Sequence, residues 1–388
     1  MNAISKHIRG DRVIWMVIIL LSMISILAVY SSTGTLAYKV RGGNTGYYLI
    51  KQLIFLALGI FIIIATSAVP YKYYSRMSQI FLFIAIPVLA LTLITGPSIN
   101  EARRWLTLPG IGFTIQPSDF AKLAIIMYVA RVLSLKQDEL GDFKGAYLQI
   151  IWPVILVCGL IMPANLSTAA ILFATSMALM FVGRIPFKFL ALTIGGGILV
   201  LTLFITISLY FDKGGRIATW KNRIENFVSG EETDDNFQVN RAKIAVVNGG
   251  LIGQGPGNST QRNYLPHPYS DFIYAIIIEE YGLFGGTFVL FLYLWLFFRA
   301  GLIVRRSTRT FAALLALGLS MGLVLQALIN MAVAVNLVPV TGQTLPFVSM
   351  GGSSILFTSV ALGMILSVSH GVEEERKEDL KNPKNSNE

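Results

Sequence analysis

The sequence contains long intervals without a single charged side chain, and these intervals decide what the chain can fold into. Residues 146–183 and 310–372 contain no Asp, Glu, Lys or Arg. A transmembrane helix needs about 20 mainly apolar residues, so each interval has room for two helices. Over the whole chain 54% of residues are hydrophobic and 13% are charged, whereas a soluble protein has about 25% charged residues. The sequence therefore predicts an all-α polytopic membrane protein.

Charge-free intervals and clusters of Pro and Gly together predict ten membrane spans. Pro163–Asn165 and the loop 336–352 divide the two long intervals into helical hairpins. The ten spans are expected within residues 13–30, 48–69, 77–95, 117–133, 146–183 (two), 189–211, 271–298 and 310–372 (two). Spans seven and eight are separated by a large loop of roughly 60 residues, 212–270, and connections of this length are usually functional or partly structured.

The distribution of Lys and Arg orients these spans. Basic residues gather in the turns on the side of the amino terminus: Lys72, Arg76, Arg131, Lys136, Lys144, Arg184, Lys188, Arg299, Arg305, Arg306 and Arg309. The positive-inside rule makes this side cytoplasmic, so both termini are expected in the cytoplasm and the loop 212–270 outside. The sequence thus predicts one transmembrane domain, residues 1–372, and a charged cytoplasmic tail, residues 373–388, that is disordered.

Several classes of protein are excluded by what the sequence lacks. A single cysteine, Cys158, excludes a disulfide framework within the chain. The net charge of +10 reflects topology signals rather than a nucleic-acid surface, because the basic residues fall between apolar runs. The run Gly253–Gly257 has the wrong spacing for a dinucleotide fingerprint and no P-loop occurs, so we expect neither a nucleotide nor an organic cofactor.

Three polar segments interrupt the apolar spans on the outer side: residues 100–122, 216–271 and 336–354. The second contains a glycine-rich run, which is more typical of a flexible turn than of an anion-binding nest. Asp271 then opens an apolar helix that carries Glu279 and Glu280, and ionisable residues that enter a membrane are functional by default. An equally open interpretation is that Ser270 or Asp271 caps the helix, and that basic residues neutralise Glu279 and Glu280.

The first polar segment combines two arginines with a helix start. Arg103 and Arg104 precede Trp105, an arrangement that suits an interfacial anchor or bidentate binding of phosphate. Residues Gln116–Asp119 form an ordinary helix start with an acidic first turn. Asp119 and Lys122 lie three residues apart and are expected on one helix face. In the third segment, Pro and Gly predict non-helical backbone that lines protein or water.

Together these segments resemble a known family. The similar stretches are ARRWLTLPGIGFTIQPSDFAKL (102–123), the glycine-rich loop with SDFIYAIIIEEYGLFGG (270–286), and PVTGQTLPFVSMGGSS (339–354). In this order they resemble the motifs of the SEDS peptidoglycan glycosyltransferases, FtsW and RodA, and the resemblance covers most of the chain. The segment 216–224 is more similar to the division member FtsW than to the elongation member RodA.

The resemblance implies an enzyme of the bacterial cytoplasmic membrane, at the division septum. It would polymerise lipid II into a nascent glycan at the outer face and release undecaprenyl pyrophosphate. The implied partners are a class B penicillin-binding protein and other division proteins, with no nucleic acid. The glycines of 195–197 and 318–322 are candidate contact surfaces for a partner helix, although internal packing is the commoner use. A lipid II flippase, a division scaffold and a RodA-type elongation polymerase remain as alternatives.

The chemistry of glycosyl transfer and the family resemblance together predict a role for each polar residue in these segments. Asp271 aligns with the family's motif aspartate and is expected to be the general base. Substrate binding is expected at Arg103, Arg104, Lys122, Asn258, Ser259, Gln261 and Ser349. Supporting structural roles are expected at Trp105, Gln116, Ser118, Asp119, Glu279 and Glu280. Positive charge near the leaving pyrophosphate would come from the basic residues or from a divalent cation, Mg²⁺ or Mn²⁺.

The chain departs from the family's pattern at several positions. Asp119 stands where the family has Glu in QPSE, and Asn165 stands where its QPDLGT hairpin has Asp. His267, Tyr269 and Ser270 replace the Glu, His and Thr of LPExHTDF, and Met350 replaces the Tyr of SYGG. A shared role for the hairpin carboxylate is therefore not carried over to Asn165.

Overall fold

The computed structural model describes residues 9–96, 98–99, 102–107, 114–211 and 234–381. The segment 216–224, on which part of the resemblance rests, lies outside the described residues, as do residues 382–388. Each of the ten ranges predicted to span the membrane contains a helix. These helices are α1 (Arg12–Ser32), α3 (Thr45–Ala68), α4 (Tyr71–Thr95), α5 (Pro117–Leu135), α6 (Leu148–Ile161), α7 (Leu166–Val182), α8 (Phe187–Phe211), α11 (Ile273–Arg306), α12 (Thr310–Ala334) and α13 (Gly352–Lys381).

Short elements connect the long helices. Two are helices, α2 (Gly34–Arg41) and α10 (Asp234–Gly249). Four two-residue strands form two antiparallel pairs, β1 (Ser98–Ile99) with β2 (Ala102–Arg103), and β3 (Leu106–Thr107) with β4 (Thr114–Ile115). Single turns of other helix types cover Gln137–Glu139, Phe143–Tyr147 and Gln261–Asn263. The all-α fold class is thereby confirmed.

Seven of the described helices are long and apolar enough to cross a membrane. α7 and the first part of α8 are shorter apolar helices, and α5 carries Asp119, Lys122 and Arg131 among its 19 residues. The structure therefore confirms a polytopic architecture, and the count of ten spans stays a prediction. The boundaries have local causes: Asp11 caps α1 by accepting from Val13 N (2.8 Å), and Asn165 caps α7 by accepting from Thr168 N (3.2 Å).

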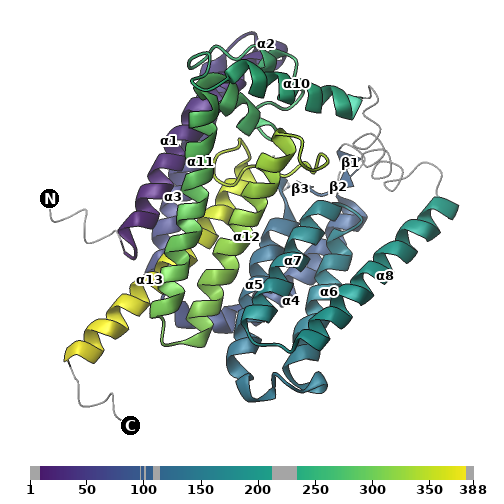
Figure 1. Ribbon diagram of the computed structural model, residues 1–388, viewed down its shortest axis with the longest axis vertical. Helices are drawn as coiled ribbons and strands as arrows, with labels where there is room; N and C mark the ends of the chain where they lie inside the picture. The colour runs from purple at the N-terminus through teal and green to yellow at the C-terminus, as the bar shows by residue number, and fades with distance from the viewer. Residues whose placement is uncertain (1–8, 97, 100–101, 108–113, 212–233, 382–388) are drawn as a thin grey trace.

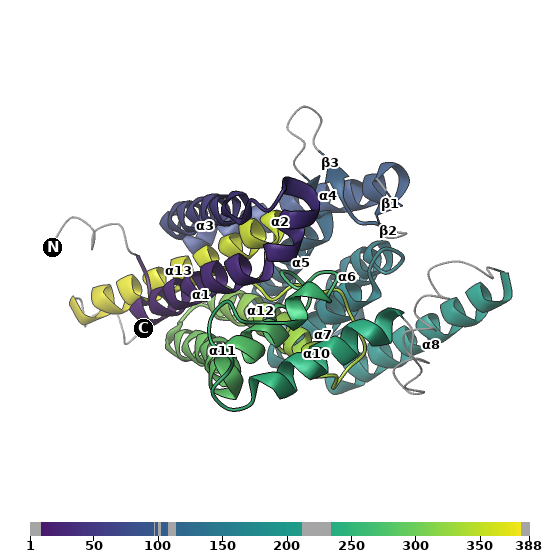
Figure 2. The same ribbon diagram turned by 90° about the horizontal axis from the view of Figure 1, so that it is seen from above.

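The helices form a bundle in which small residues allow close contact. α13 lies along α3, and a Cβ on Gly363 would stand 1.7 Å from Thr66 Oγ1. Gly59 of α3 faces Ser359 of α13 in the same way, at 2.7 Å. Such small-residue contacts hold membrane helices together where the hydrophobic effect is absent. By contrast, α8 diverges from the bundle in both views (Figures 1 and 2), and a Cβ built on Gly195 or Gly196 would meet no other segment within 4 Å among the described residues.

One end of the bundle gathers the start of α1, the start of α4, the α11–α12 connection and the late part of α13. Arg299 pairs with Asp11, and Glu375 accepts from Tyr71 Oη (2.6 Å) and Thr308 Oγ1 (3.2 Å). This is the end predicted to be cytoplasmic, and we call the opposite end the outer end. The sequence predicted a disordered tail from residue 373, whereas residues 373–381 continue α13 as a helix, on which His370 and Glu374 pair at 3.1 Å.

α11 consists of two parts with different surroundings. Every residue from Phe272 to Glu280 is buried within the protein. Gly282 then breaks the helix with φ 69° and ψ −173°. Beyond it, large apolar side chains are exposed at helical spacing: Leu283, Phe284, Phe288, Phe291, Leu294 and Phe298. An exposed apolar face of this kind meets lipid.

The structure refines two expectations for this region. Residues 272–280, inside the span predicted from Asp271, are buried in the protein, and the exposed apolar side chains begin at Leu283, so Glu279 and Glu280 are enclosed by protein. The helix starts at Ile273, and its N-cap is Phe272, which makes no side-chain capping bond. The interpretation of Ser270 or Asp271 as the cap is therefore wrong, and their polar groups have other partners.

Candidate active site

Asp271 lies in the turn before α11 and is held there by uncharged polar groups. The Ser270 hydroxyl donates to Asp271 Oδ1 at 2.6 Å. Asn330 Nδ2 of α12 donates to the Asp271 carbonyl at 2.9 Å, and Ser349 Oγ donates to the Ser270 carbonyl at 2.6 Å. The carboxylate itself is half-buried. These contacts fix the backbone at Asp271 and leave its side chain accessible.

Arg104 approaches Asp271 across Gly342. Gly342 has φ +64°, and a Cβ built on it would lie 3.8 Å from Arg104 Nη1 and 3.8 Å from Asp271 Oδ2. The guanidinium and the carboxylate thus face the same small space, from the β2–β3 connection and from the start of α11. The structure brings these two predicted site residues together. Arg103 belongs to β2, and the position of its side chain lies outside the described part of the structure.

An apolar cavity of about 470 Å³ opens beside Arg104 between α7 and α12. Its polar lining comes from Arg104, Asn165, Ser167 and Thr341, and its apolar lining from Ala164, Leu166, Ala170, Ile171, Ala174, Leu325, Ile329, Val338, Pro339 and Val340. Cavities that bind small ligands usually measure about 300–1,000 Å³ and combine an apolar wall with a few polar groups. This cavity therefore has the size and lining of a ligand site with a cation at one side.

Two buried polar atoms near this space lack a partner among the described residues, namely Asn330 Oδ1 and Thr341 Oγ1. Asn330 is held by its amide nitrogen, which donates to the carbonyls of Asp271 (2.9 Å) and Gln343 (2.7 Å). A buried polar atom without a hydrogen bond is costly, and such atoms often mark places where a ligand or water binds. Both atoms belong to the segments that surround Asp271 and the cavity.

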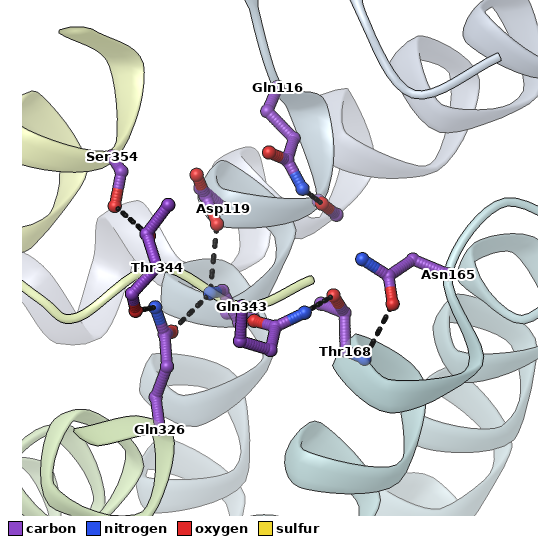
Figure 3. Close-up of polar contacts among 10 residues, drawn as sticks. Gln116, Asp119, Asn165, Thr168, Gln326, Gln343, Thr344 and Ser354 are labelled. Carbon is purple, nitrogen blue, oxygen red and sulfur yellow. Dashed lines mark hydrogen bonds and ion pairs between the residues drawn. The ribbon is translucent and has the colours of Figure 1, made fainter. Parts of the chain in front are cut away.

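Lys122 lies deeper in the bundle and is already paired. Its Nζ is 2.8 Å from Asp119 Oδ1 and donates to Gln326 Oε1 at 2.9 Å. Gln326 Nε2 donates onward to the Thr344 carbonyl at 3.0 Å, and Figure 3 shows Asp119 and Gln326 converging on this position. The expected pairing of Asp119 and Lys122 on one helix face is confirmed. Lys122 supports the loop before α13, and its contact with substrate stays a prediction.

Hydrogen bonds also hold the other side of the loop before α13, residues 336–351. Gln343 Nε2 donates to Thr168 Oγ1 at 2.7 Å, which connects the loop to the start of α7 (Figure 3). Gln116 Nε2 donates to Ser118 Oγ at 3.0 Å, and Gln116 makes no helix-capping bond. The non-helical segment 336–351 therefore lines protein and a cavity, as its Pro and Gly content predicts.

The glycine-rich loop, residues 249–257, is not the flexible turn that its composition suggests. A Cβ on Gly249 would stand 2.1 Å from the Ile278 carbonyl oxygen, and one on Gly253 would stand 2.2 Å from the Glu280 carbonyl oxygen. Gln254 N and Gly255 N donate to the carbonyls of Glu279 and Glu280, both at 3.0 Å. The glycines are needed because two backbones are in direct contact.

Glu279 organises the turn that follows this loop. Its carboxylate accepts hydrogen bonds from Ser259 Oγ, from Thr260 N (3.2 Å) and Oγ1 (3.0 Å), and from Gln261 N (3.3 Å). Glu279 thus receives hydroxyl and amide donors rather than the basic residue that one interpretation expected. Ser259 and Gln261 are buried against it, which favours a structural role for both.

The remaining predicted site residues have local partners. Glu280 accepts from the Ser31 hydroxyl, and Arg262 Nη1 donates to Ser31 O and Oγ at 2.9 Å. Asn258 is exposed and donates to the Gln254 carbonyl at 2.9 Å. Ser349 is buried and accepts from Leu345 N at 2.8 Å, so it fixes the loop. Trp105 is half-buried. Substrate binding by Asn258, Ser259, Gln261 and Ser349 stays a prediction without support from these contacts.

Tyr269 lies close to the aspartate. Burial, together with the nearby Tyr48 and Asp271, raises the pKa of Tyr269. The phenol therefore stays protonated and uncharged beside the Asp271 carboxylate. Its hydroxyl is 3.5 Å from His267 Nδ1, and its carbonyl accepts from Met350 N at 2.9 Å. His267, Tyr269 and Met350 are positions at which the chain departs from the family's motifs, and here Tyr269 contacts the other two.

A metal site made by the protein alone has no support. Among the described residues, no group of three or more His, Cys, Asp or Glu side chains could hold a metal ion. Mg²⁺ is commonly held by one or two carboxylates together with substrate phosphates. Asp271 Oδ2 lies within 4 Å of a Cβ built on Gly342, so a cation held by this carboxylate would take its other ligands from a phosphate-bearing substrate.

Sequence reasoning missed several residues that build the site. Gln326 and Asn330 are uncharged polar residues inside the apolar helix α12, and such residues in membrane helices usually bond to other segments. That signal could have found them. Gly342 and Thr341 carried no comparable signal, because their positions depend on the path of the loop.

Comparison with known proteins now identifies the family. The sequence profile described as "Cell cycle protein", which unites FtsW, RodA and SpoVE, matches residues 11–374. The chain belongs to the FtsW/RodA/SpoVE family. This confirms the resemblance drawn from the motifs.

Relatives within the FtsW/RodA/SpoVE family match along almost the whole chain. A "Probable peptidoglycan glycosyltransferase FtsW" of Trichlorobacter lovleyi is 31% identical over 368 residues, 93% of this chain and 93% of that protein. "Stage V sporulation protein E" of Bacillus subtilis is 33% identical over 374 residues, 94% and 98% of the two chains.

Solved structures show the same fold. A chain in the structure titled "Structural coordination of polymerization and crosslinking by a peptidoglycan synthase complex" gives a TM-score of 0.73 at 22% identity, covering 94% of this chain and 98% of that chain. The rod shape determining protein RodA of Thermus thermophilus gives a TM-score of 0.66 at 23% identity, covering 93% and 96%. The chain is therefore a multi-pass membrane protein with a RodA-like fold.

Proposed function

We propose that the chain is a peptidoglycan glycosyltransferase that polymerises lipid II and releases undecaprenyl pyrophosphate. The observation that carries this proposal is the pair of opposite charges, Asp271 and Arg104, on the two sides of Gly342 and beside an apolar cavity. Glycosyl transfer from a lipid pyrophosphate needs a base for the acceptor hydroxyl and positive charge for the leaving group. The family relatives named peptidoglycan glycosyltransferase support the same chemistry.

Asp271 serves as the general base in this proposal. The acceptor hydroxyl loses its proton to the carboxylate while its oxygen forms a bond to the anomeric carbon of the donor sugar. The bond between that carbon and the pyrophosphate oxygen breaks, and the pyrophosphate leaves with the electron pair. The Ser270 hydroxyl, which donates to Oδ1, orients the carboxylate so that Oδ2 faces the space at Gly342.

Arg104 and the cavity bind the lipid-linked donor. A guanidinium offers a planar fork of N–H donors that matches phosphate oxygens. The apolar wall of α7 and α12 would take the first isoprene units of the lipid, which enter sideways from the bilayer. A divalent cation, if used, would be held by Asp271 and the pyrophosphate oxygens, and it would supply further charge to the leaving group.

The distribution of charges favours an enzyme over a flippase. In the described helices the charged residues lie near the ends: Lys51, Asp119, Lys122, Glu279 and Glu280 toward the outer end, and Lys72, Arg76, Arg131, Lys188, Arg299, Arg305 and Arg306 toward the other. A translocation path for a charged headgroup would need polar or charged groups across the middle. A scaffold would have no need for the arrangement of Asp271 and Arg104.

Partners, location and orientation complete the proposal. We place the enzyme in the bacterial cytoplasmic membrane at the septum, with both termini inside, and with a class B penicillin-binding protein and other division proteins as partners. The similarity to a chain of a peptidoglycan synthase complex supports a partner, and the FtsW relatives support the division role. The open glycines Gly195 and Gly196 on α8 are available for helix contact, whereas Gly318 packs internally on Ile126 and Leu179.

The deciding experiment uses labelled lipid II. The purified chain in nanodiscs, with and without a cognate class B penicillin-binding protein, should convert lipid II into long glycan that a muramidase digests. Asp271→Asn serves as the matched inactive control. Movement of intact lipid II between leaflets without any glycan would instead show a flippase, and partner binding with no glycan and no movement would show a scaffold.

A further inference from the structure

The glycine-rich loop and the bend of α11 together expose an apolar surface that the proposed reaction does not use. Val247 at the end of α10 is 77% exposed, Leu251 is 64% exposed and Ile252 is 81% exposed. Phe284, in the first turn after the bend, is 70% exposed. We call these four residues the elbow patch. Large apolar side chains exposed together mark a surface that something covers.

Backbone hydrogen bonds make the elbow patch one surface. Leu283 N donates to the Gly250 carbonyl at 2.9 Å, and Phe284 N donates to the Leu251 carbonyl at 3.3 Å. A Cβ on Gly282 would lie 2.2 Å from the Leu251 carbonyl oxygen, so the loop rests directly on the bend. The patch therefore continues the exposed apolar face that runs down α11 through Phe288 and Phe291.

The backbone of the glycine-rich loop and of the bend at Gly282 is suited to an apolar environment. Irregular backbone is not tolerated in contact with hydrocarbon unless its polar groups have partners. The bend at Gly282 leaves the amides of Leu283 and Phe284 without helical acceptors, and the loop carbonyls supply them. The backbone amides of Gln254 and Gly255 in the loop likewise donate to the carbonyls of Glu279 and Glu280 in the helix. Loop and bend thus satisfy each other's polar groups without water.

We propose that the elbow patch inserts into the outer leaflet and that the acyl chains of bilayer lipids cover it. Continuity with the lipid-facing side of α11 argues for lipid as the occupant rather than a second protein. Lys243 and Asn248 are exposed on α10 next to the patch, and polar side chains at that level reach the headgroups. The loop is then an interfacial anchor rather than a substrate loop.

The anchor has a consequence for the buried first part of α11. The loop that carries Leu251 and Ile252 also bonds the backbone at Glu279 and Glu280, and this part of the helix leads directly to Asp271. Lipid contact at the patch therefore sets the height of the Asp271 turn above the bilayer. The inference does not depend on the proposed reaction.

Site-directed spin labelling of the full chain tests the position of the patch. Cys158 is the only native cysteine, so Cys158→Ala gives a background for single labels. Nitroxides would be placed at Ile252→Cys and Leu251→Cys in nanodiscs of phosphatidylethanolamine and phosphatidylglycerol. Phe291→Cys, further along the exposed apolar face of α11, is the lipid-facing control. Asn263→Cys, an exposed polar position on the next turn, is the aqueous control.

Oxygen concentrates in the bilayer and a nickel chelate stays in water, so collision rates with the two report the surroundings of each label. We expect labels at 251 and 252 to collide with oxygen several-fold more than with the nickel chelate, as at 291, and the label at 263 to show the reverse. A nickel-accessible label at both 251 and 252 would overturn the inference. Protection from both reagents would overturn it too, because a protein would then cover the patch.

Discussion

Two adjacent glutamates should respond differently to the loss of their charge, because the structure gives them different partners. Glu279 accepts from Ser259 Oγ, Thr260 N, Thr260 Oγ1 and Gln261 N. Glu280 accepts from a single side-chain hydroxyl, Ser31 Oγ, and the backbone amides of Gly257 and Ser259 and the Arg262 guanidinium lie near its carboxylate. Both side chains are fully buried, so burial does not distinguish them.

The expected magnitudes follow from these bonds. In Glu279→Gln one oxygen can keep the two bonds from Thr260 and the one from Gln261, but each changes from charge-assisted to neutral, a loss of about 1 kcal/mol per bond. The free energy of unfolding should therefore fall by about 3 kcal/mol, which is roughly a hundredfold in the folding equilibrium. In Glu280→Gln the bond from Ser31 Oγ and the attraction to Arg262 weaken, while the cost of burying a charge disappears. Its net change should stay within about 1 kcal/mol.

Unfolding of the purified variants by titration with a denaturing detergent measures both changes under one condition. Glu280→Gln is the matched control, because it removes the same charge from the neighbouring position. An equal loss of stability in the two variants, or a larger one in Glu280→Gln, would refute the reasoning from hydrogen-bond partners. Glycan synthesis by the folded fraction of Glu279→Gln should remain, since its carboxylate does not face the cavity.

Three further variants test the site. Asp271→Asn keeps the bond from Ser270 but removes basicity, so glycan synthesis should fall about 10²- to 10⁴-fold at unchanged stability; a wild-type rate would remove the base assignment. Arg104→Lys keeps the charge but loses the bidentate fork, so KM for lipid II should rise several-fold, and an unchanged KM would contradict its role. Lys122→Met leaves Asp119 buried without its partner and should cost about 3–5 kcal/mol of stability; adding Asp119→Leu should recover most of this loss, and no recovery would contradict the pairing.

The sequence predicted the helices well because a bilayer leaves the backbone few alternatives. Uncharged apolar runs in lipid must form helices to satisfy their backbone groups, and each predicted range does contain a helix. The hairpin break at Pro163–Asn165 also follows from local chemistry, since Asn165 caps α7. What failed was the environment of one helix: hydropathy does not distinguish the protein-enclosed residues 272–280 from the lipid-facing residues that follow Gly282.

The candidate site was predicted in part, for a related reason. Polar residue types located the segments around Asp271 and Arg104, which the structure brings together at Gly342. The direction of a side chain depends on tertiary contacts, so the sequence did not predict that Ser259 and Gln261 bind Glu279, and their contact with substrate stays a prediction. The glycine-rich loop was misjudged because its acceptors, the carbonyls of Glu279 and Glu280, lie far along the chain.

The contacts of the other carboxylates explain why Asp271 is the residue suited to take up a proton. Asp119 is neutralised by Lys122 at 2.8 Å, and Glu279 is saturated by donors from the turn at Ser259. Glu280 is enclosed against Ser31, away from the cavity. Among the described carboxylates near the outer end, Asp271 alone combines partial exposure with a guanidinium across a glycine. A base must be able to reach its proton and to release it again, and this combination of access and nearby positive charge provides both.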